Sequence, residues 1–139
     1  MIGADTLVPG RAAAPVLALH EPLSFWGGYD AATGRIIDRR HPQSGTICAG
    51  RIIVVRAGRG SSSGSSVLAE ALRAGTGPAG FVLAERDAIL TVGALVALEL
   101  YAVACPIVVA PEEIFLRLAA QAALSIDAGP AGAVIRIGA

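Results

Sequence analysis

The sequence predicts an α/β domain in which a mixed sheet or small barrel is covered by helices. Short apolar runs rich in Val and Ile recur along the chain, as is typical of buried strands. In the middle of the chain these runs alternate with segments of helical periodicity, and further strand-like runs stand before and after them. The 139 residues suffice for one compact domain, so we expect residues 1–139 to form a single domain without a linker.

The first third of the chain is predicted to hold short strands separated by loops. Pro9-Gly10 marks a turn between two apolar runs, and residues 20–34 are interpreted as a long loop that carries the only Trp. Residues 39–46 are polar and rich in turn-forming types. We expect strands at residues 7–8, 16–19 and 35–38.

A central strand, a turn rich in glycine and serine, and a helix follow one another in the middle of the chain. The strand is the apolar run Arg51–Arg56, and the helix is expected from Ser63 or Gly64 to Ala74. Gly75 stands where a left-handed glycine often ends a helix. Backbone N–H groups and the helix dipole at the start of such a helix favour a bound anion. The segment between strand and helix, residues 58–64, is called the serine turn below and is the first candidate for a functional site.

The rest of the chain is predicted to continue the alternation and then to close with strands. Pro111 followed by two glutamates is typical of a first helical turn. The apolar stretch 89–110 resembles a membrane span, but Glu99 near its middle and Pro106 near its end favour a buried helix followed by a buried strand. We expect strands at 80–84 and 106–109, helices at 89–102 and 111–122, and a closing hairpin of residues 124–127 and 133–137.

Composition excludes several classes of function. The formal net charge is +0, so the chain lacks the positive surface that nucleic-acid binding requires. Two cysteines, Cys48 and Cys105, are too few for a disulfide framework or a metal site of four thiolates, so we expect a free loop thiol and a free core thiol. No signal peptide is seen, and a cytoplasmic location is expected. The chain is 54% hydrophobic, which favours self-association when it is isolated.

The serine turn matches no common nucleotide or nucleophile motif in full. A Walker A loop requires a lysine, and the chain contains none. Gly60-x-Ser62-x-Gly64 matches a nucleophile elbow, but both histidines, His20 and His41, precede it. In a dinucleotide-binding fingerprint, G-x-G-x-x-G, Glu85 would be the carboxylate that binds the ribose. Here the third glycine of that motif comes one residue late, at Gly64. A turn that only caps a helix also remains open.

Five segments of the chain, taken in order, resemble the small subunit of aconitase X, which is the swivel domain of the aconitase superfamily. The resemblance runs from about Pro15 to Val109 and implies a swivelling β/β/α-type domain. The segments are Leu23-Ser24-Phe25-Trp26-Gly27-Gly28-Tyr29-Asp30, Thr33-Gly34-Arg35-Ile36-Ile37-Asp38, His41-Pro42, Ala49-Gly50-Arg51-Ile52 and Gly58-Arg59-Gly60-Ser61-Ser62-Ser63-Gly64-Ser65.

The resemblance implies a lyase: one subunit of a hydro-lyase, or dehydratase, that is inactive without its large subunit. Enzymes of this family remove water from a small hydroxy acid, with an iron–sulfur cluster on the large subunit as Lewis acid. We expect cis-3-hydroxy-L-proline as the substrate, because the lysine-free, Ala- and Arg-rich composition looks bacterial, with phosphomevalonate as the alternative. An alternative of another class is a non-catalytic α/β module that binds a nucleotide or another anion at the serine turn.

The resemblance also assigns roles within the serine turn. The family's base, which takes the proton from the α-carbon, falls on Ser61, while Ser62 and Ser63 fall where the substrate carboxylate is held. Better-known aconitases carry an arginine at the position of Ser63, so Arg59 is expected to supply the cation from the other side of the turn. A serine is a useful base only if its alkoxide is stabilised, and amides from Gly60 onward, the helix start and Arg59 would do so.

Two further segments have both a structural and a functional interpretation. The aromatic segment Phe25–Tyr29, within the loop Phe25–Asp30, is either a hydrophobic plug over one end of the sheet or a lid and docking surface for the large subunit. The polar segment after it either contacts substrate or partner or, as we favour, forms a solvated charged turn. Its candidate residues are Arg35, Arg39, Arg40 and His41.

Overall fold

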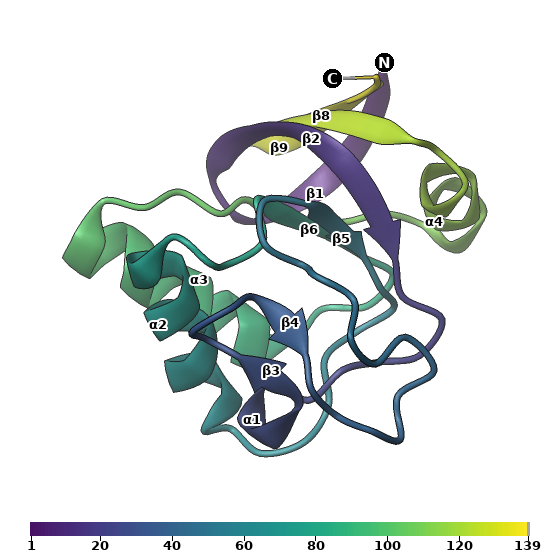
Figure 1. Cartoon of the computed structure of the whole chain (residues 1–139). Helices are drawn as coiled ribbons and strands as arrows, with labels where there is room; N and C mark the ends of the chain where they lie inside the picture. The colour runs from purple at the N-terminus through teal and green to yellow at the C-terminus, as the bar shows by residue number, and fades with distance from the viewer. Residues whose placement is uncertain (139) are drawn as a thin grey trace.

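A computed structural model describes residues 1–138 and shows a closed barrel of seven strands with four helices (Figure 1). The strand order around the barrel is β1-β7-β6-β5-β2-β8-β9, and β3 and β4 form a separate two-stranded hairpin. The elements in chain order are β1 (Ile2–Val8), β2 (Gly10–Ala18), α1 (Phe25–Gly28), β3 (Tyr29–Asp30), β4 (Arg35–Ile36), β5 (Ile52–Val54), α2 (Gly64–Ala74), β6 (Gly80–Leu83), α3 (Ala88–Tyr101), β7 (Ile107–Val109), α4 (Glu112–Ala119), β8 (Ala123–Gly129) and β9 (Gly132–Ile137).

The barrel is mixed, as the sequence predicts. Strands β2, β5, β6 and β7 run parallel to one another, whereas β1 pairs antiparallel with both β7 and β9 and thereby closes the barrel. Strands β1 and β2 are longer than the apolar runs 7–8 and 16–19 suggested. Exposed positions alternate with partly or fully buried ones along much of both strands, so solvent-facing residues such as Asp5 and Arg11 interrupt the apolar pattern.

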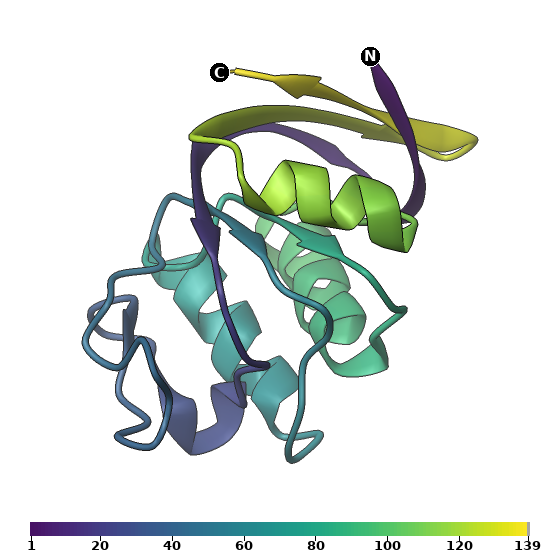
Figure 2. The same ribbon diagram turned by 90° about the vertical axis from the view of Figure 1, so that its right-hand side faces the viewer.

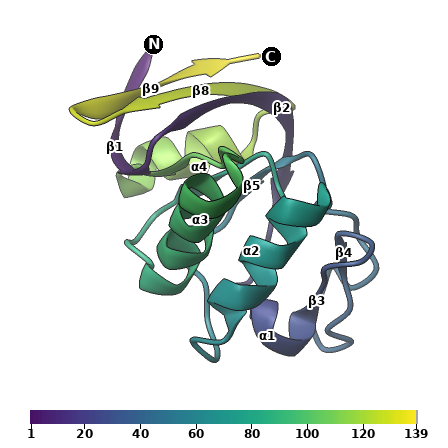
Figure 3. The ribbon, with the colours of Figure 1, turned by 90° about the vertical axis from the view of Figure 1, so that its left-hand side faces the viewer.

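Two hydrophobic cores lie on the two faces of the parallel strands. In β5, Ile52 and Val54 pack inside the barrel, whereas Ile53 packs against the helices on the outer face. Phe115 and Leu118 of α4 belong to the inner core, so α4 closes one side of the barrel. Figures 2 and 3 show α4 beneath the β8–β9 ribbon and the α2–α3 pair covering the parallel strands. Burial on both faces explains why these strands appear as continuous apolar runs.

The helices begin and end near the predicted residues. Helix α2 ends at Gly75, whose φ of 81° is left-handed, and α3 spans Ala88–Tyr101 where 89–102 was expected. Helix α4 is shorter than the predicted 111–122, because the chain turns at Ala120 to enter β8. Among the described residues, no helix has the length and apolar character needed to cross a membrane.

The aromatic segment contains more structure than the predicted loop. Phe25 in the short turn α1 stacks on Tyr29 at 4.5 Å between ring centroids and meets the edge of Phe81 at 6.1 Å. The Tyr29 hydroxyl donates a hydrogen bond of 2.6 Å to the carbonyl oxygen of Thr76. Phe25 and Tyr29 therefore form the plug that the sequence suggested, whereas Trp26 is 57% exposed.

Candidate functional site

The serine turn lies at the carboxyl end of β5. The loops that follow the parallel strands of the barrel lie together at this edge. The loop after β2 reaches the turn through Ser24, and the loop after β6 reaches it through Asp87. Such an edge is where α/β sheets commonly bind ligands, because loops from neighbouring strands converge there. The topology thus places the sequence-predicted site at a position suited to binding.

The shape of the serine turn depends on Gly60. Its φ of 87° is left-handed, a conformation that residues with a side chain rarely adopt. A Cβ atom at this position would also lie 2.2 Å from Ser24 Oγ. The Ser24 hydroxyl itself donates a hydrogen bond of 3.0 Å to the carbonyl oxygen of Trp26. The turn therefore packs directly on the segment that leads into α1.

The three consecutive serines form an exposed entry into α2. The Ser63 N–H donates to Ser61 Oγ at 3.2 Å, and the Ser61 carbonyl accepts from the N–H of Gly64 at 3.0 Å. Within the described residues, the N–H groups of Ser61 and Ser62 make no hydrogen bond in the structure. Exposed hydroxyls and free amides at the start of an 11-residue helix together suit an anionic group.

Arg59 projects from the serine turn toward two carboxylates. One guanidinium nitrogen lies 3.9 Å from Glu21 Oε1 and the other lies 3.7 Å from Asp38 Oδ2. These distances are long for ion pairs, and the Arg59 side chain is 44% exposed, so the contacts contribute little to stability. Arg59 is thus held beside the turn by contacts that an incoming anion can replace.

Asp87 joins the serine turn to the start of α3. Its Oδ2 accepts a hydrogen bond of 2.7 Å from the Gly58 N–H, and its Oδ1 accepts one of 2.9 Å from the Leu90 N–H. On the other side of the turn, the Ser65 hydroxyl donates to the carbonyl oxygen of Ile89 at 2.7 Å. Sequence reasoning missed Asp87, although an aspartate directly before a helical pattern is a recognisable N-cap signal.

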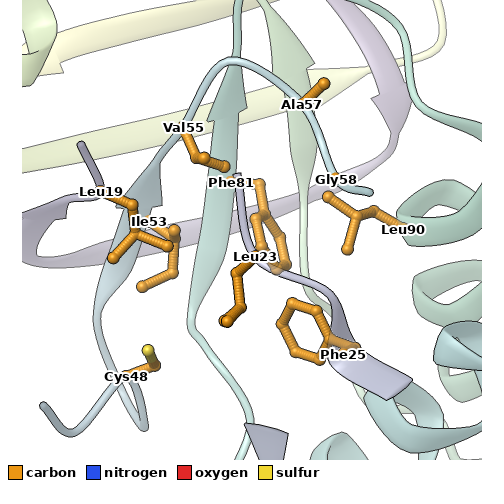
Figure 4. A pocket seen from close by; sticks show the side chains of 10 residues that line it. All are labelled: Leu19, Leu23, Phe25, Cys48, Ile53, Val55, Ala57, Gly58, Phe81 and Leu90. Carbon is orange, nitrogen blue, oxygen red and sulfur yellow. The ribbon is translucent and has the colours of Figure 1, made fainter. Parts of the chain in front are cut away.

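A cavity of about 10 Å³ lies beneath the serine turn. Figure 4 shows its apolar lining, with Gly58 and Ala57 from the approach to the turn and Phe25, Phe81 and Cys48 among the other side chains. This volume equals about one water-sized probe, so no substrate fits inside. A ligand of the serine turn would therefore have to bind on the open face of the turn.

Neither cysteine is suited to hold a cofactor. Cys48 lies in a loop, as expected, but it is as well buried as the core thiol Cys105, and both are free. Burial raises the pKa of each thiol to about 12, and Arg51 opposes part of that rise at Cys48. Iron–sulfur clusters take three or four thiolates, and residues 1–138 contain no group of three or more His, Cys, Asp or Glu side chains placed to bind a metal.

His41 is a structural residue rather than part of a solvated charged turn, so that interpretation is wrong for it. Only 3% of His41 is exposed. Its Nδ1 accepts a hydrogen bond of 3.0 Å from the Gln43 N–H, so the proton is on Nε2, which donates to the Glu21 carbonyl oxygen at 3.0 Å. The arginines of this segment, Arg35, Arg39 and Arg40, are exposed. Exposure of Arg39 and Arg40 fits both a solvated charged turn and a contact with substrate or partner, whereas Arg35 belongs to β4 and donates a hydrogen bond of 2.6 Å to the Gly45 carbonyl oxygen.

Comparison with known proteins shows where this architecture recurs. A family model described as the aconitase X swivel domain matches residues 1–136. A cis-3-hydroxy-L-proline dehydratase of Hypocrea jecorina is 39% identical over 127 residues, which are 91% of this chain and 21% of that relative. This chain therefore spans about a fifth of that relative's length. A phosphomevalonate dehydratase small subunit of Methanothermobacter thermautotrophicus is 39% identical over 88 residues, covering 63% of this chain and 67% of that relative.

Two solved structures share the whole fold. The crystal structure of holo aconitase X from Thermococcus kodakaraensis superposes with a TM-score of 0.77 at 26% identity, covering 98% of this chain and 99% of the matched chain. The solution NMR structure of a UPF0107 protein superposes with a TM-score of 0.80 at 28% identity, covering 98% of this chain and 97% of that one. The resemblance and the fold expected from the sequence are both confirmed.

Proposed function

The chain belongs to the aconitase X swivel-domain family, and from this membership we propose that it is the small subunit of a dehydratase acting on a small hydroxy acid. The observation that carries the proposal is the family match over residues 1–136 together with the exposed serine turn at the carboxyl edge of the barrel. A swivel domain alone is half of an active site. The chain would therefore act only when its turn faces a larger subunit.

We propose cis-3-hydroxy-L-proline as the substrate. The relative that matches 91% of this chain carries that activity in its name. Phosphomevalonate is the second candidate, because the relative named as its dehydratase small subunit is matched over 67% of its own length, as expected for a separate small chain. The two substrates differ in one feature that matters here, since phosphomevalonate carries a phosphate that calls for more cations than Arg59 alone provides.

In the proposed reaction, the Ser61 alkoxide removes the proton from the α-carbon of the substrate and thereby becomes a hydroxyl. The electron pair left on that carbon forms the new double bond as hydroxide leaves the adjacent carbon. The Ser61 hydroxyl is exposed and its oxygen accepts a hydrogen bond from the Ser63 N–H, which stabilises negative charge on that oxygen. A single preorganised donor of this kind is worth about 3 kcal/mol in a dry site.

The substrate carboxylate is proposed to bind beside Ser61, on the start of α2. Gly60 brings the backbone close, Ser62 and Ser63 supply hydroxyls, and the free N–H of Ser62 is a donor. Arg59 would leave its long contacts with acidic side chains to pair with the carboxylate. A charge-assisted pair at ordinary distance is stronger than the contacts it replaces.

The iron–sulfur cluster implied by the family is proposed to reside on the large subunit. Both cysteines of this chain are buried, and two thiols are fewer than the three or four that such a cluster takes, which supports placing the cluster ligands on the partner. The departing hydroxyl and its Lewis acid would therefore belong to the partner. The serine turn would supply the base and the carboxylate site.

The first test is anaerobic affinity purification of the tagged chain from its own cells, followed by mass spectrometry and iron analysis. We expect a larger cysteine-bearing, iron-containing protein in fixed ratio. The purified complex is then assayed with cis-3-hydroxy-L-proline and with phosphomevalonate. A chain that purifies alone, or a complex that dehydrates neither compound, would contradict the proposed function.

The second test is the Ser61→Ala variant of that complex, with Ser66→Ala as the matched control. Ser66 is also exposed but lies in the first turn of α2, outside residues 58–64, and its side chain makes no hydrogen bond to the serine turn among the described residues. We expect Ser61→Ala to lower kcat by at least about 100-fold, the usual scale for removal of a general base. Full turnover with alanine at 61 would show that another group is the base.

A further inference from the structure

We propose that Asp87 is a positioning residue that fixes the serine turn against helix α3, and this inference rests on the proposed role of Ser61. Asp87 lies outside the turn and accepts a hydrogen bond from the backbone N–H of Gly58. Its effect on the reaction would therefore pass through the placement of the Ser61 hydroxyl. The structure supports this role from both ends of the turn.

The two oxygens of the Asp87 carboxylate connect the entry of the serine turn to the start of α3. One oxygen accepts from the Gly58 N–H at 2.7 Å and the other accepts from the Leu90 N–H at 2.9 Å. Hydrogen bonds from backbone N–H groups to a carboxylate are charge-assisted and stronger than neutral ones. A Cβ atom on Gly58 would lie 2.9 Å from Asp87 Oδ2, so glycine permits this close approach.

The exit of the serine turn is attached to the same part of α3. The Ser65 hydroxyl donates to the Ile89 carbonyl oxygen at 2.7 Å. Behind this contact, a Cβ atom at Gly93 would lie 2.8 Å from the Ser65 carbonyl oxygen, which shows how closely the two helices approach. Asp87 and Ile89 thus hold the entry of the serine turn and the residue that directly follows it.

This attachment to α3 matters because the side chains of the serine turn itself have few contacts that hold them in place. Ser61, Ser62 and Ser63 are exposed, and the contacts of Arg59 are long. A base must stand within hydrogen-bond reach of the proton it removes, and a misplacement of about 1 Å can cost about 100-fold in rate. The Asp87 bridge therefore provides the positional precision that the exposed serines lack.

The experiment compares two Asp87 variants with one control in the assembled complex. Asp87→Ser keeps an oxygen that can cap α3 but is too short to reach Gly58 as well, and Asp87→Asn replaces one acceptor by a donor. The control is Thr91→Val, which removes the 2.7 Å bond from the Thr91 hydroxyl to the Asp87 carbonyl oxygen and leaves the carboxylate untouched. All three variants alter the first turn of α3.

We expect Asp87→Ser and Asp87→Asn to lower kcat by about 10- to 100-fold with KM changed by less than about twofold, because the turn is misplaced while the anion site persists. Thr91→Val should stay within about twofold of the wild type in both. Amide hydrogen exchange of each isolated chain gives a second readout. Faster exchange should be confined to Gly58 and the serine turn in the Asp87 variants.

The outcomes separate this inference from the proposed function. If the wild-type complex is active and Asp87→Ser keeps the same kcat, the positioning role of Asp87 is overturned. The proposed function is then unaffected. A complex without wild-type turnover would overturn the proposed function, and hydrogen exchange would then decide whether Asp87 orders the turn. Unchanged exchange in the Asp87 variants, or an equal effect of Thr91→Val, would overturn the inference in either case.

Discussion

Single glycines set the shape of the serine turn through two separate constraints. Gly60 combines a left-handed φ of 87° with a close approach to Ser24, whereas Gly45 has a similar φ of 90° but open space around its Cβ position. A substitution at Gly45 therefore tests the cost of the left-handed backbone alone, whereas one at Gly60 tests that cost together with the steric clash against Ser24. The comparison matters because the serine turn must pack on the loop after β2 to hold its place.

Gly60→Ala should destabilise the chain more than Gly45→Ala does. Alanine costs about 1–2 kcal/mol in a left-handed conformation at either position. At position 60 the new methyl must also displace Ser24, so we expect a further drop in stability and a loss of turnover of at least about tenfold. Thermal unfolding and steady-state assays of the complex measure both effects. Equal destabilisation with equal activity would show that Ser24 moves aside freely.

Burial of the two thiols predicts how they react. Because Cys48 and Cys105 are buried and the pKa of each is raised to about 12, neither should react with a thiol reagent at pH 8 while the chain is folded. Both should react at once in denaturant. Counting modified thiols by mass spectrometry checks this. Rapid labelling of Cys48 in the native chain would mean that its loop opens.

At the scale of elements, the α2–α3 contact supports the site from behind. Gly93 lies where these helices meet, and a Cβ there would approach Ser65 O at 2.8 Å and Leu68 Cβ at 3.1 Å. In most helices alanine is more favourable than glycine by about 1 kcal/mol. Here the contact reverses that preference, because added volume must push the helix carrying the serine turn away from α3.

Gly93→Ala should therefore lower the free energy of unfolding, by about 1–3 kcal/mol. Val92→Ala serves as the control, since Val92 is the adjacent residue of α3 and is 49% exposed. The control should stay within about 0.5 kcal/mol of the wild type. Urea unfolding followed by circular dichroism compares the two variants. A stabilising Gly93→Ala would mean that the helices separate without cost.

The sequence predicted elements well where burial was uniform and less well where it alternated. The fully buried strands β5, β6 and β7 were found within one or two residues, because each is a continuous apolar run. The start of β1 and most of β2 were missed, since their solvent faces carry residues such as Asp5 and Arg11. His41 was misjudged because one of its partners, the Glu21 carbonyl, lies 20 residues away in the sequence, and no local pattern reveals such a contact. The location of the serine turn was predictable, but its attachment to α3 through Asp87 was not.

At the scale of the whole molecule, a buried tyrosine hydroxyl and two buried thiols link the free energy of unfolding to pH. Burial raises the pKa of Tyr29, Cys48 and Cys105 above their ordinary values, with both thiols near 12. In the unfolded chain these groups lose their protons from about pH 9 upward, whereas in the folded chain they keep them. The unfolded state therefore binds fewer protons at high pH, and stability must fall there.

We expect the free energy of unfolding to be unaffected by these groups below about pH 8 and to fall steadily as pH rises from about 9 toward 12. Cys105→Ala should flatten this fall, because one of the protonated groups is gone, even though the variant starts from a lower stability. Urea unfolding at a series of pH values measures the slope. An equally steep alkaline fall in the variant would assign the effect to other groups.

The pairing of β1 with β9 has a consequence for how this domain can be combined with others. Because the first and last strands are neighbours, the start of β1 and the end of β9 lie side by side at the pole of the barrel opposite α1 (Figure 1). A covalent extension that follows β9 or precedes β1 would leave from that pole, away from the serine turn. The domain can therefore be fused to a longer polypeptide or exist as a separate chain without a change at the edge of the barrel that carries the serine turn.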